Sequence, residues 1–509
     1  MIDLPVSNVN KPQDIDVLFI HPGSPSAVYQ ELGQDLSALE PPVLAALFAT
    51  YVRNKGLTTA IIDVPVLNLN AGQVADLICR QYQPKLIAVV VYGFQPSAST
   101  QTMMAAGDVC RAIKHKNDAL KIIMTGTHPA ALPQRTLDEE DIDFVCDREG
   151  PITIYQTVMA IKKGSQHSLK QSPNPYSSIP NLWYRNDGKV HRSESSALID
   201  DLDREMPIPA WDLLPMAKYR AHNWHCFEHI TERQPYASIY TSLGCPYKCA
   251  FCCINAPFGK PSYRMWSPQT IIKQIDVLVH EYGVKNIKIA DEMFVLNRQH
   301  VLGMCDLLID RGYDLNIWAY ARIDTVKDEY LEKLRKAGFR WLALGIESAS
   351  SLVRDGVEKG TFGIPDIIKT VRNIQDAGIN VIGNYIFGLP DDSYDSMKET
   401  LALAQETNCE FANFYSAMAY PGSKLYDEAL TQGQPLPETW LAYSQHSYNC
   451  LPLSTATLSA GQVLQFRDEA FMTYYTNPGY LESIQKKFGM EVVRHINEMT
   501  NIPLKRKVC

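Results

Sequence analysis

Short apolar runs that alternate with segments of helical period constrain the first third of this chain more than any other feature. The runs are rich in β-branched residues and cover residues 15–20, 58–64, 85–93, 121–126 and 142–147. Continuous hydrophobicity over so few residues is typical of strands buried on both faces. The segment after the first run has apolar residues at helical spacing and a helix stop at Gly56. The alternation predicts an α/β domain over residues 1–164 that contains a doubly wound parallel sheet.

Small, polar or glycine-containing segments follow three of these runs, at residues 21–26, 92–94 and 126–129. Sheets of this kind bind ligands beyond the carboxyl ends of their strands, and glycine lets a ligand approach the backbone closely. No G-x-G-x-x-G follows the first strand, which disfavours a nicotinamide dinucleotide. We therefore expect these loops to bind a different ligand.

Residues 165–235 are rich in Ser, Pro, Asn and charged residues, and we interpret them as a linker with little core of its own. The linker contains His222, His225, Cys226 and His229. Their spacing would permit a metal site, but no second ligand pair lies nearby in the sequence. We expect these residues to contact substrate or line an interface, and the role of the three histidines stays open.

A second strand and helix alternation covers residues 236–430. Its six apolar runs are residues 236–242, 286–294, 316–324, 341–348, 380–390 and 411–420. Helical segments separate them, and several close with glycine. The pattern predicts a partial (β/α)6 barrel with its chemistry at the carboxyl ends of the strands. Residues 431–509 have helical periodicity, and we expect a helical region that caps the barrel.

Four cysteines lie within nine positions directly after the first barrel strand. Cys245, Cys249 and Cys252 are spaced C-x-x-x-C-x-x-C, and Cys253 follows at once. A structural zinc site needs four ligands, usually in two separated pairs. Three thiolates in one loop suit a [4Fe–4S] cluster in which one iron lacks a protein ligand. We expect Cys253 to be a packed thiol outside the cluster.

The motif C-x-x-x-C-x-aromatic-C, with Phe251 as the aromatic residue, is the signature of radical S-adenosylmethionine (SAM) enzymes, and residues 236–430 resemble that family over their whole length. The first 164 residues resemble the Rossmann-like cobalamin-binding domain that precedes the barrel in many of these enzymes. The match lies in the segments GTHPAALP and DFVCDREGP, residues 126–133 and 143–151. The cobalt-ligating pattern D-x-H-x-x-G is incomplete, because Phe19 replaces its Asp and Gly23 falls one place early. The resemblance thus implies cobalamin without His21 on cobalt.

The resemblance also implies roles for individual residues. Phe251 would lie beside the adenine of SAM, Asp291 and Glu292 would contact its amino group, and Arg322 would hold its carboxylate. Glu347 and Ser348 would bind the ribose or the amino acid part, and Gly383 and Gly388 would let adenine stack on the backbone. The residues implied for cobalamin are Ser24, Tyr92, Gly93, Gly126, Thr127, His128 and Glu149. Packing or an ion pair inside the barrel is the alternative role for the glycines and for Arg322.

In this family, SAM chelates the open iron and is cleaved to methionine and a 5′-deoxyadenosyl radical. The resemblance implies a C-methyltransferase that uses cobalamin to methylate an unactivated carbon of a small metabolite or natural-product precursor. A cobalamin-using cyclase or oxidoreductase is one alternative, and a cobalamin-binding sensor module is another. A methylthiotransferase acting on RNA is disfavoured because Cys79, Cys110 and Cys146 are too dispersed for a second cluster.

Composition limits the partners. The net charge of −8 disfavours a nucleic acid partner, which would need a basic face. We find neither a signal-like start nor an apolar run long enough to span a bilayer, so we expect a cytoplasmic enzyme. Such an enzyme needs an electron donor, for which flavodoxin or ferredoxin is the expectation, and a small-molecule substrate.

Overall fold

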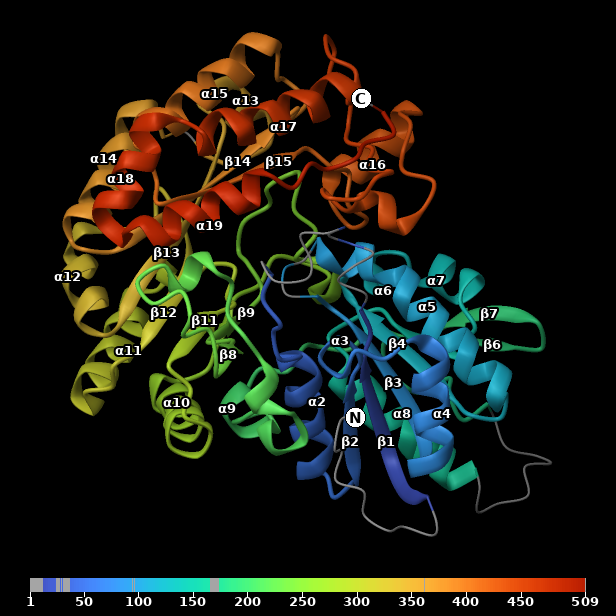
Figure 1. Cartoon of the computed structure of the whole chain (residues 1–509). Coiled ribbons are helices and arrows are strands. Elements are labelled where there is room, and N and C mark those ends of the chain that lie inside the picture. The colour runs from blue at the N-terminus through green and yellow to red at the C-terminus, as the bar shows by residue number, and fades with distance from the viewer. Residues whose placement is uncertain are drawn as a thin grey trace. The chain divides into compact units, whose positions relative to one another are not determined.

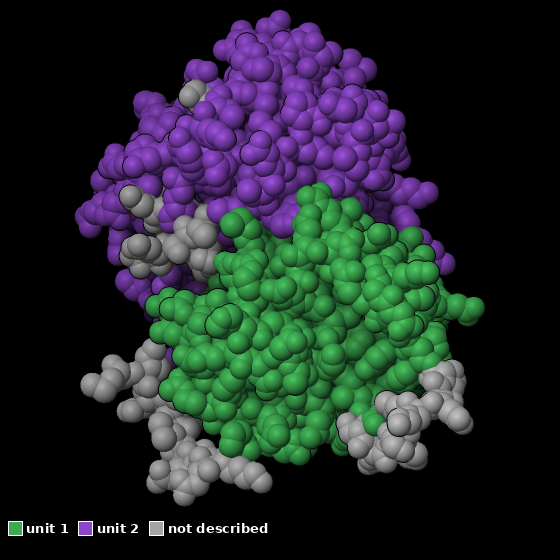
Figure 2. All heavy atoms as spheres, turned by 90° about the vertical axis from the view of Figure 1, so that its right-hand side faces the viewer, with its two compact units in different colours: residues 1–24, 42–214, 256–259 green, residues 25–41, 215–255, 260–509 purple. Residues whose placement is uncertain are grey.

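The computed structural model describes residues 12–23, 28, 30, 37–93, 95, 97–164, 174–360 and 362–508. The chain forms two compact units, coloured separately in Figure 2. Unit 1 comprises residues 1–24, 42–214 and 256–259, and unit 2 comprises residues 25–41, 215–255 and 260–509. In the described residues, no helix is long and apolar enough to cross a membrane.

Unit 1 is built on a seven-stranded sheet in the order β2-β1-β3-β4-β5-β6-β7 (Figure 1). Its first five strands are β1 (Gln13–His21), β2 (Thr59–Asp63), β3 (Tyr82–Val91), β4 (Ile122–Gly126) and β5 (Phe144–Cys146), and they run parallel. Because the chain passes from β1 to one side and later returns to the other, the strand order reverses between β1 and β3. A reversal of this kind is where doubly wound sheets bind ligands. The predicted fold class is confirmed for this unit.

Helices cover both faces of this sheet. Helices α2 (Val43–Asn54) and α8 (Pro151–Gly164) pack together, and α4 (Ala71–Gln81) packs with α5 (Ala98–Lys116). The shorter helices are α3 (Val64–Leu67), α6 (Thr127–Ala131) and α7 (Pro133–Glu139). Helix α2 buries Leu47, Phe48 and Tyr51 and is followed by Gly56 at a φ of 82°, as the sequence pattern predicts. The left-handed backbone favours glycine at this position.

Two strands lie inside the segment that we expected to be only a linker. Strands β6 (Leu182–Asn186) and β7 (Lys189–Arg192) extend the sheet as an antiparallel hairpin beyond β5. Asp187 and Gly188 connect them with φ values of 51° and 74°. Two consecutive positive φ values are typical of the tight turn that joins hairpin strands. Residues 174–214 therefore belong to unit 1, and the linker prediction is wrong for this segment.

Unit 2 contains a sheet of six parallel strands in the order β15-β14-β13-β12-β11-β8 (Figure 1). The strands are β8 (Tyr236–Ile239), β11 (Asn286–Ile289), β12 (Asn316–Arg322), β13 (Phe339–Glu347), β14 (Asn380–Phe387) and β15 (Phe411–Ser416). The helices between them are α10 (Pro268–Tyr282), α11 (Arg298–Arg311), α12 (Asp328–Lys336), α13 (Ser351–Gly356), α14 (Ile364–Asp376) and α15 (Tyr394–Thr407). A small antiparallel pair, β9 (Ser242–Leu243) and β10 (Arg264–Met265), follows β8. Five of the six predicted runs contain a parallel strand, and the run 341–348 overlaps β13, which begins two residues earlier at Phe339.

The six-stranded sheet curls around a cluster of aromatic rings. The ring of Trp224 lies 5.1 Å from Trp318 on β12, 5.6 Å from Trp341 on β13 and 5.8 Å from Phe411 on β15, between ring centroids. Strands β12 and β15 are separated by two others, so one ring touches both only if the sheet is curved. This curvature makes the sheet a partial barrel, as predicted, with aromatic packing near the amino ends of its strands.

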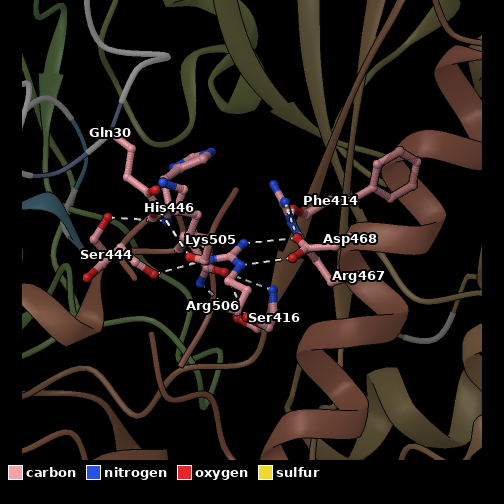
Figure 3. Close-up of polar contacts among 11 residues, drawn as sticks. Gln30, Phe414, Ser416, Ser444, His446, Arg467, Asp468, Lys505 and Arg506 are labelled. Carbon is pink, nitrogen blue, oxygen red and sulfur yellow. Dashed lines mark hydrogen bonds and ion pairs between the residues drawn. The ribbon is translucent and has the colours of Figure 1, made fainter. Parts of the chain in front are cut away.

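The residues after β15 are largely helical, with α16 (Lys424–Gln432), α17 (Ala460–Tyr475), α18 (Pro478–Phe488) and α19 (Met490–Thr500). Lys505, Arg506 and Lys507 form a basic run, in which the Arg506 side chain is only 4% exposed. It pairs with Asp468 at 2.8 Å (Figure 3). It also donates to the carbonyl of Gln445. An arginine with these partners is part of the packed structure.

Candidate functional site

The loop that carries the four cysteines begins at a position where only glycine fits. Gly244 follows β9 with a φ of 87°, and a Cβ atom there would lie 2.6 Å from the carbonyl oxygen of Ser262. Backbone hydrogen bonds at Ala250 then tie the loop to two other segments of the chain. The Ala250 N–H donates to the carbonyl of Val357, and the Leu425 N–H donates to the carbonyl of Ala250. These bonds fix the path of the loop at the carboxyl ends of the barrel strands.

The four thiols differ in exposure. Cys249 and Cys252 are half-buried, whereas Cys253 is 2% exposed. Cys245 is buried, and burial raises the pKa of its thiol to about 11. Burial also raises the pKa of Cys253, to about 12. A metal must therefore displace protons from thiols that are otherwise neutral.

In the part of the chain that the structure describes, no three His, Cys, Asp or Glu side chains are gathered around the position of a single metal ion. A [4Fe–4S] cluster holds its thiolates on separate irons and so further apart than one ion does. The donor set of Cys245, Cys249 and Cys252, three sulfurs on one anchored loop, fits such a cluster.

Arg322 ends β12 beside this loop. Its Nη1 donates to the sulfur of Cys249 at 3.6 Å, and its Cζ lies 4.0 Å from the ring centroid of Tyr247. Nε and Nη2 donate to the two carboxylate oxygens of Asp324, both at 3.0 Å, and Nη2 also donates to the carbonyl of Lys359. These partners occupy the guanidinium on every side, so it is poorly placed for its expected contact with the SAM carboxylate.

Lys359 is the residue of this site that the sequence reasoning missed. Its ammonium lies 2.5 Å from the carboxylate of Glu347 and 5.9 Å from the ring centroid of Phe251. Both partners in the ion pair are under 10% exposed, and the φ of Glu347 is 65°, an uncommon value for a residue with a side chain. Lys359 thus brings Glu347 and Phe251, both predicted to contact SAM, into one place.

Asp291 and Glu292 follow β11 but face different surroundings. The Asp291 carboxylate accepts bonds from the backbone and hydroxyl of Thr241, at 2.6 and 2.5 Å, and from the Ser242 hydroxyl at 2.6 Å. The Glu292 carboxylate acts electrostatically on the thiols of Cys245 and Cys252. Burial raises the pKa of Glu292 to about 7. Of the two, Glu292 is the acid whose charge acts on the thiols of the cysteine loop.

Three further residues predicted to contact SAM have other partners. Ser348 follows the end of β13, and its buried hydroxyl lies 3.2 Å from that of Thr400 on α15. A Cβ atom on Gly383 would lie 2.7 Å from the ring of Tyr385, and one on Gly388 would collide with the side chain of Val463 on α17. The geometry of both glycines matches the packing role.

The histidines at 222–229 do not reach the cysteine loop. His225 Nε2 lies 2.9 Å from the carbonyl of Asn316, the first residue of β12, so it sits at the amino end of the barrel. Burial lowers its pKa to about 3. His222 accepts a bond from the backbone of Ala38 and stacks on Trp224. Their expected contact with substrate is not supported, because the carboxyl ends of the strands lie at the opposite end.

In unit 1, glycines stand at the carboxyl ends of three neighbouring strands. Gly93, Gly126 and Gly150 have φ values of 71°, 152° and 115° and follow or end β3, β4 and β5. A Cβ atom on Gly126 would collide with the carbonyl oxygen of Val91, and one on Gly93 would lie 2.6 Å from the Ala98 side chain. Because the space beside each glycine is filled by the chain's own atoms, internal packing requires glycine at these positions. All three lie at the edge where doubly wound sheets bind ligands.

The other residues predicted to contact cobalamin surround these glycines. Thr127 and His128 begin α6 and are buried; burial lowers the pKa of His128 to about 3, and its Nδ1 lies 3.2 Å from the Thr100 hydroxyl. The Tyr92 hydroxyl donates to the Glu149 carbonyl, and the Glu149 carboxylate accepts from the backbone of Ile199. Ser24 lies outside the described residues.

His21 ends β1, opposite Asp63 on β2. Its Nδ1 lies 2.9 Å from the Asp63 carboxylate, and both side chains are buried. That cobalamin binds without this histidine on cobalt stays a prediction.

A partial parallel barrel with three thiols on an anchored loop defines the class as iron–sulfur enzymes, here joined to a doubly wound ligand-binding unit. Comparison with known proteins gives the family. Residues 239–404 match the radical SAM superfamily, and residues 33–157 match the B12 binding domain. The chain belongs to the radical SAM enzymes that carry a B12-binding domain, and its cofactors are a [4Fe–4S] cluster, SAM and cobalamin.

Several relatives and solved structures are similar over most of their length. The uncharacterized methyltransferase PH0819 of Pyrococcus horikoshii is 27% identical over 488 residues, covering 96% of this chain and 98% of the relative. The anaerobic magnesium-protoporphyrin IX monomethyl ester cyclase of Rubrivivax gelatinosus is 27% identical, covering 81% of this chain and 69% of the relative. The methyltransferase TsrM of Kitasatospora setae, solved with cobalamin and a [4Fe–4S] cluster, has a TM-score of 0.65 at 15% identity, covering 92% of this chain and 90% of that one. The cobalamin-dependent enzyme OxsB has a TM-score of 0.61 at 18% identity, covering 95% of this chain and 72% of that one.

Proposed function

We propose that this chain is a cobalamin-dependent radical SAM C-methyltransferase that acts on a small metabolite or natural-product precursor. The observation that carries the proposal is that one chain joins a doubly wound unit, which matches the B12 binding domain, to a barrel with three thiols on one anchored loop. Its similarity to a methyltransferase over nearly the whole length of both chains supports methyl transfer as the outcome.

The bound groups supply the difficult chemistry: the cluster provides an electron that cleaves SAM, and cobalamin provides the methyl group. The protein's part begins with Cys245, Cys249 and Cys252, whose thiolates would hold three irons. Glu292 would then pair with the ammonium of SAM, because it is the acid that acts electrostatically on the cysteine loop.

Lys359 takes over the role that we expected of Arg322. Its ammonium stands beside Phe251 and is partnered by Glu347, so a carboxylate of SAM can replace Glu347 at the ammonium. The released Glu347 carboxylate can then accept hydrogen bonds from ribose hydroxyls. Phe251 offers its ring face to adenine. Because the ion pair is buried, an incoming carboxylate exchanges one charged partner for another in the same low-dielectric site.

In unit 1 we propose that the backbone at Gly93, Gly126 and Gly150 supports the corrin. Thr127 and His128 would contact it from the start of α6, and Tyr92 and Glu149 hold the loops around it. Ser24 is a further proposed contact. These roles rest on the position of the residues at the carboxyl ends of β3, β4 and β5.

A cobalamin-using cyclase is the second candidate. The magnesium-protoporphyrin relative from Rubrivivax gelatinosus matches 81% of this chain at the same 27% identity. A cyclase would use the same radical without leaving the SAM methyl group on its product. We also propose flavodoxin or ferredoxin as electron donor, and a cytoplasmic location.

The test is anaerobic reconstitution with iron, sulfide and hydroxocobalamin, followed by reductant and SAM that carries a CD3 methyl group. We expect a corrin absorption band on the purified protein, 5′-deoxyadenosine in the reaction, and a CD3-labelled product from a small-molecule extract of the source cells. Protein that retains no corrin would refute the proposal. Formation of 5′-deoxyadenosine with unlabelled, ring-closed products would favour the cyclase.

A further inference from the structure

The guanidinium of Arg322 already has several partners within the protein, more than an arginine that binds a ligand requires. The side chain is 5% exposed and holds the carboxylate of Asp324 with two parallel bonds. Its remaining contacts are the Lys359 carbonyl, the Tyr247 ring and the Cys249 sulfur. Two of these five contacts are to the cysteine loop, on either side of Lys248.

The contact with Cys249 has a chemical consequence. As a thiol, Cys249 also donates to the carbonyl of Glu358, at 3.7 Å. A sulfur bound to iron carries no proton and loses that bond, whereas the bond from Arg322 becomes a charged donor to a thiolate. Hydrogen bonds and positive charge at cluster sulfurs are among the features that set the reduction potential of an iron–sulfur cluster.

We propose that Arg322 is a positioning residue for the cluster, which fixes Tyr247 and Cys249 and raises the reduction potential through its bond to the Cys249 sulfur. This inference rests on the proposed cluster at Cys245, Cys249 and Cys252. Asp324 opposes the charge of Arg322 and orients it, so the two residues act on the potential in opposite directions.

The competing role is the one that the sequence suggested, in which Arg322 binds the SAM carboxylate. The two roles predict different measurements for Arg322→Gln. Loss of a charged bond to SAM would weaken SAM binding by on the order of tenfold or more. Loss of the bond to sulfur would change the ratio of oxidised to reduced cluster at a fixed potential by about tenfold, which is about 59 mV for one electron.

The experiment compares wild type, Arg322→Gln, Arg322→Lys and Asp324→Asn after anaerobic reconstitution. Iron and sulfide content gives cluster occupancy, a redox titration followed by electron paramagnetic resonance gives the midpoint potential, and calorimetry gives the affinity for SAM. The matched control is Arg467→Gln, which removes a buried arginine whose polar partners in the described chain are Phe414 and Asp468.

We expect Arg322→Gln to shift the midpoint potential of the cluster downward, Arg322→Lys to shift it less, and Asp324→Asn to shift it upward. The affinity of these variants for SAM should equal that of the wild type. The control Arg467→Gln should leave both the potential and the affinity unchanged. An unchanged potential with weaker SAM binding would overturn the inference. If the Arg322 variants hold no cluster, the Asp324→Asn result decides, and the absence of an upward shift overturns the inference. Wild-type protein that takes up no iron would instead refute the proposed function.

Discussion

A buried ion pair inside unit 2 allows a quantitative prediction. Lys288 on β11 and Glu40, which lies 248 residues earlier, pair at 3.1 Å, and their side chains are 3% and 5% exposed. The Glu40 carboxylate also accepts a bond from the Ser238 hydroxyl at 2.6 Å. The Lys288 ammonium lies 5.1 Å from the ring centroid of Trp318. Glu40→Gln removes the negative charge and leaves the ammonium buried.

Removing one partner of a buried pair costs about 3–5 kcal/mol, because the remaining charge is left without compensation. We expect the lower end of that range, because the Glu292 carboxylate also interacts with Lys288. A loss of about 3 kcal/mol raises the equilibrium constant for local opening of the strands around this pair by about a hundredfold. The double variant Glu40→Gln/Lys288→Met should recover most of this loss, because the methionine places an apolar chain against Trp318.

Amide hydrogen exchange of β8 and β11 measures this local stability without assuming that a chain of two units unfolds in one step. Exchange should be about a hundredfold faster in Glu40→Gln. The matched control is Glu332→Gln, which breaks a pair with Lys336 whose side chains are 82% and 63% exposed, and it should leave exchange unchanged. If the double variant exchanged as fast as the single one, the unpaired charge would not be the cause, and the reasoning would be wrong.

Further predictions concern the SAM site. Cys253→Ala should retain the iron of the wild type and Cys252→Ala should lose it, as measured by iron and sulfide content; the reverse would disprove the assignment of ligands. Burial raises the pKa of Glu292 to about 7, and only its ionised form pairs with an ammonium, so SAM affinity should rise as the pH passes upward through about 7. Calorimetry across that range should find that the affinity of Glu292→Gln for SAM does not change with pH. A rise as steep as that of the wild type would exclude Glu292 as the partner of the SAM ammonium. Lys359→Met should weaken SAM binding by on the order of tenfold, by loss of a charged bond, and unchanged affinity would exclude Lys359 as the partner of the carboxylate.

The main strands of both units could be predicted because a strand that is buried on both faces has a continuous run of apolar residues in the sequence. Strand β3, for example, is buried along its last six residues and reads as an uninterrupted apolar run. The hairpin of β6 and β7 was missed because only one face is buried in β6 and polar residues surround it. The pair Asp187-Gly188 was the available signal, since this dipeptide is typical of a tight hairpin turn.

The three cluster cysteines could be proposed from the sequence because their chemistry is local to one loop, and their assignment as ligands stays a prediction. Lys359 could not, because it reaches Glu347 and Phe251 only through the path of the chain after α13. Ser348 directly follows the last residue of β13, but the φ of 65° at Glu347 breaks the alternation of a strand, so the face that Ser348 takes could not be read from the sequence. Arg322 was correctly placed beside the site by its position at the end of a barrel strand, but its partners depend on tertiary packing.

The hairpin also protects the sheet of unit 1 from association. Strand β7 forms one edge, and its residues Lys189 to Arg192 are mostly exposed and include two basic side chains. Charged side chains along an edge strand oppose pairing with the backbone of another molecule. Deleting residues 182–192 would expose β5 instead, a strand whose three residues are all buried and apolar. A shortened version of this protein that omits the hairpin should therefore aggregate during expression even though the site residues are intact.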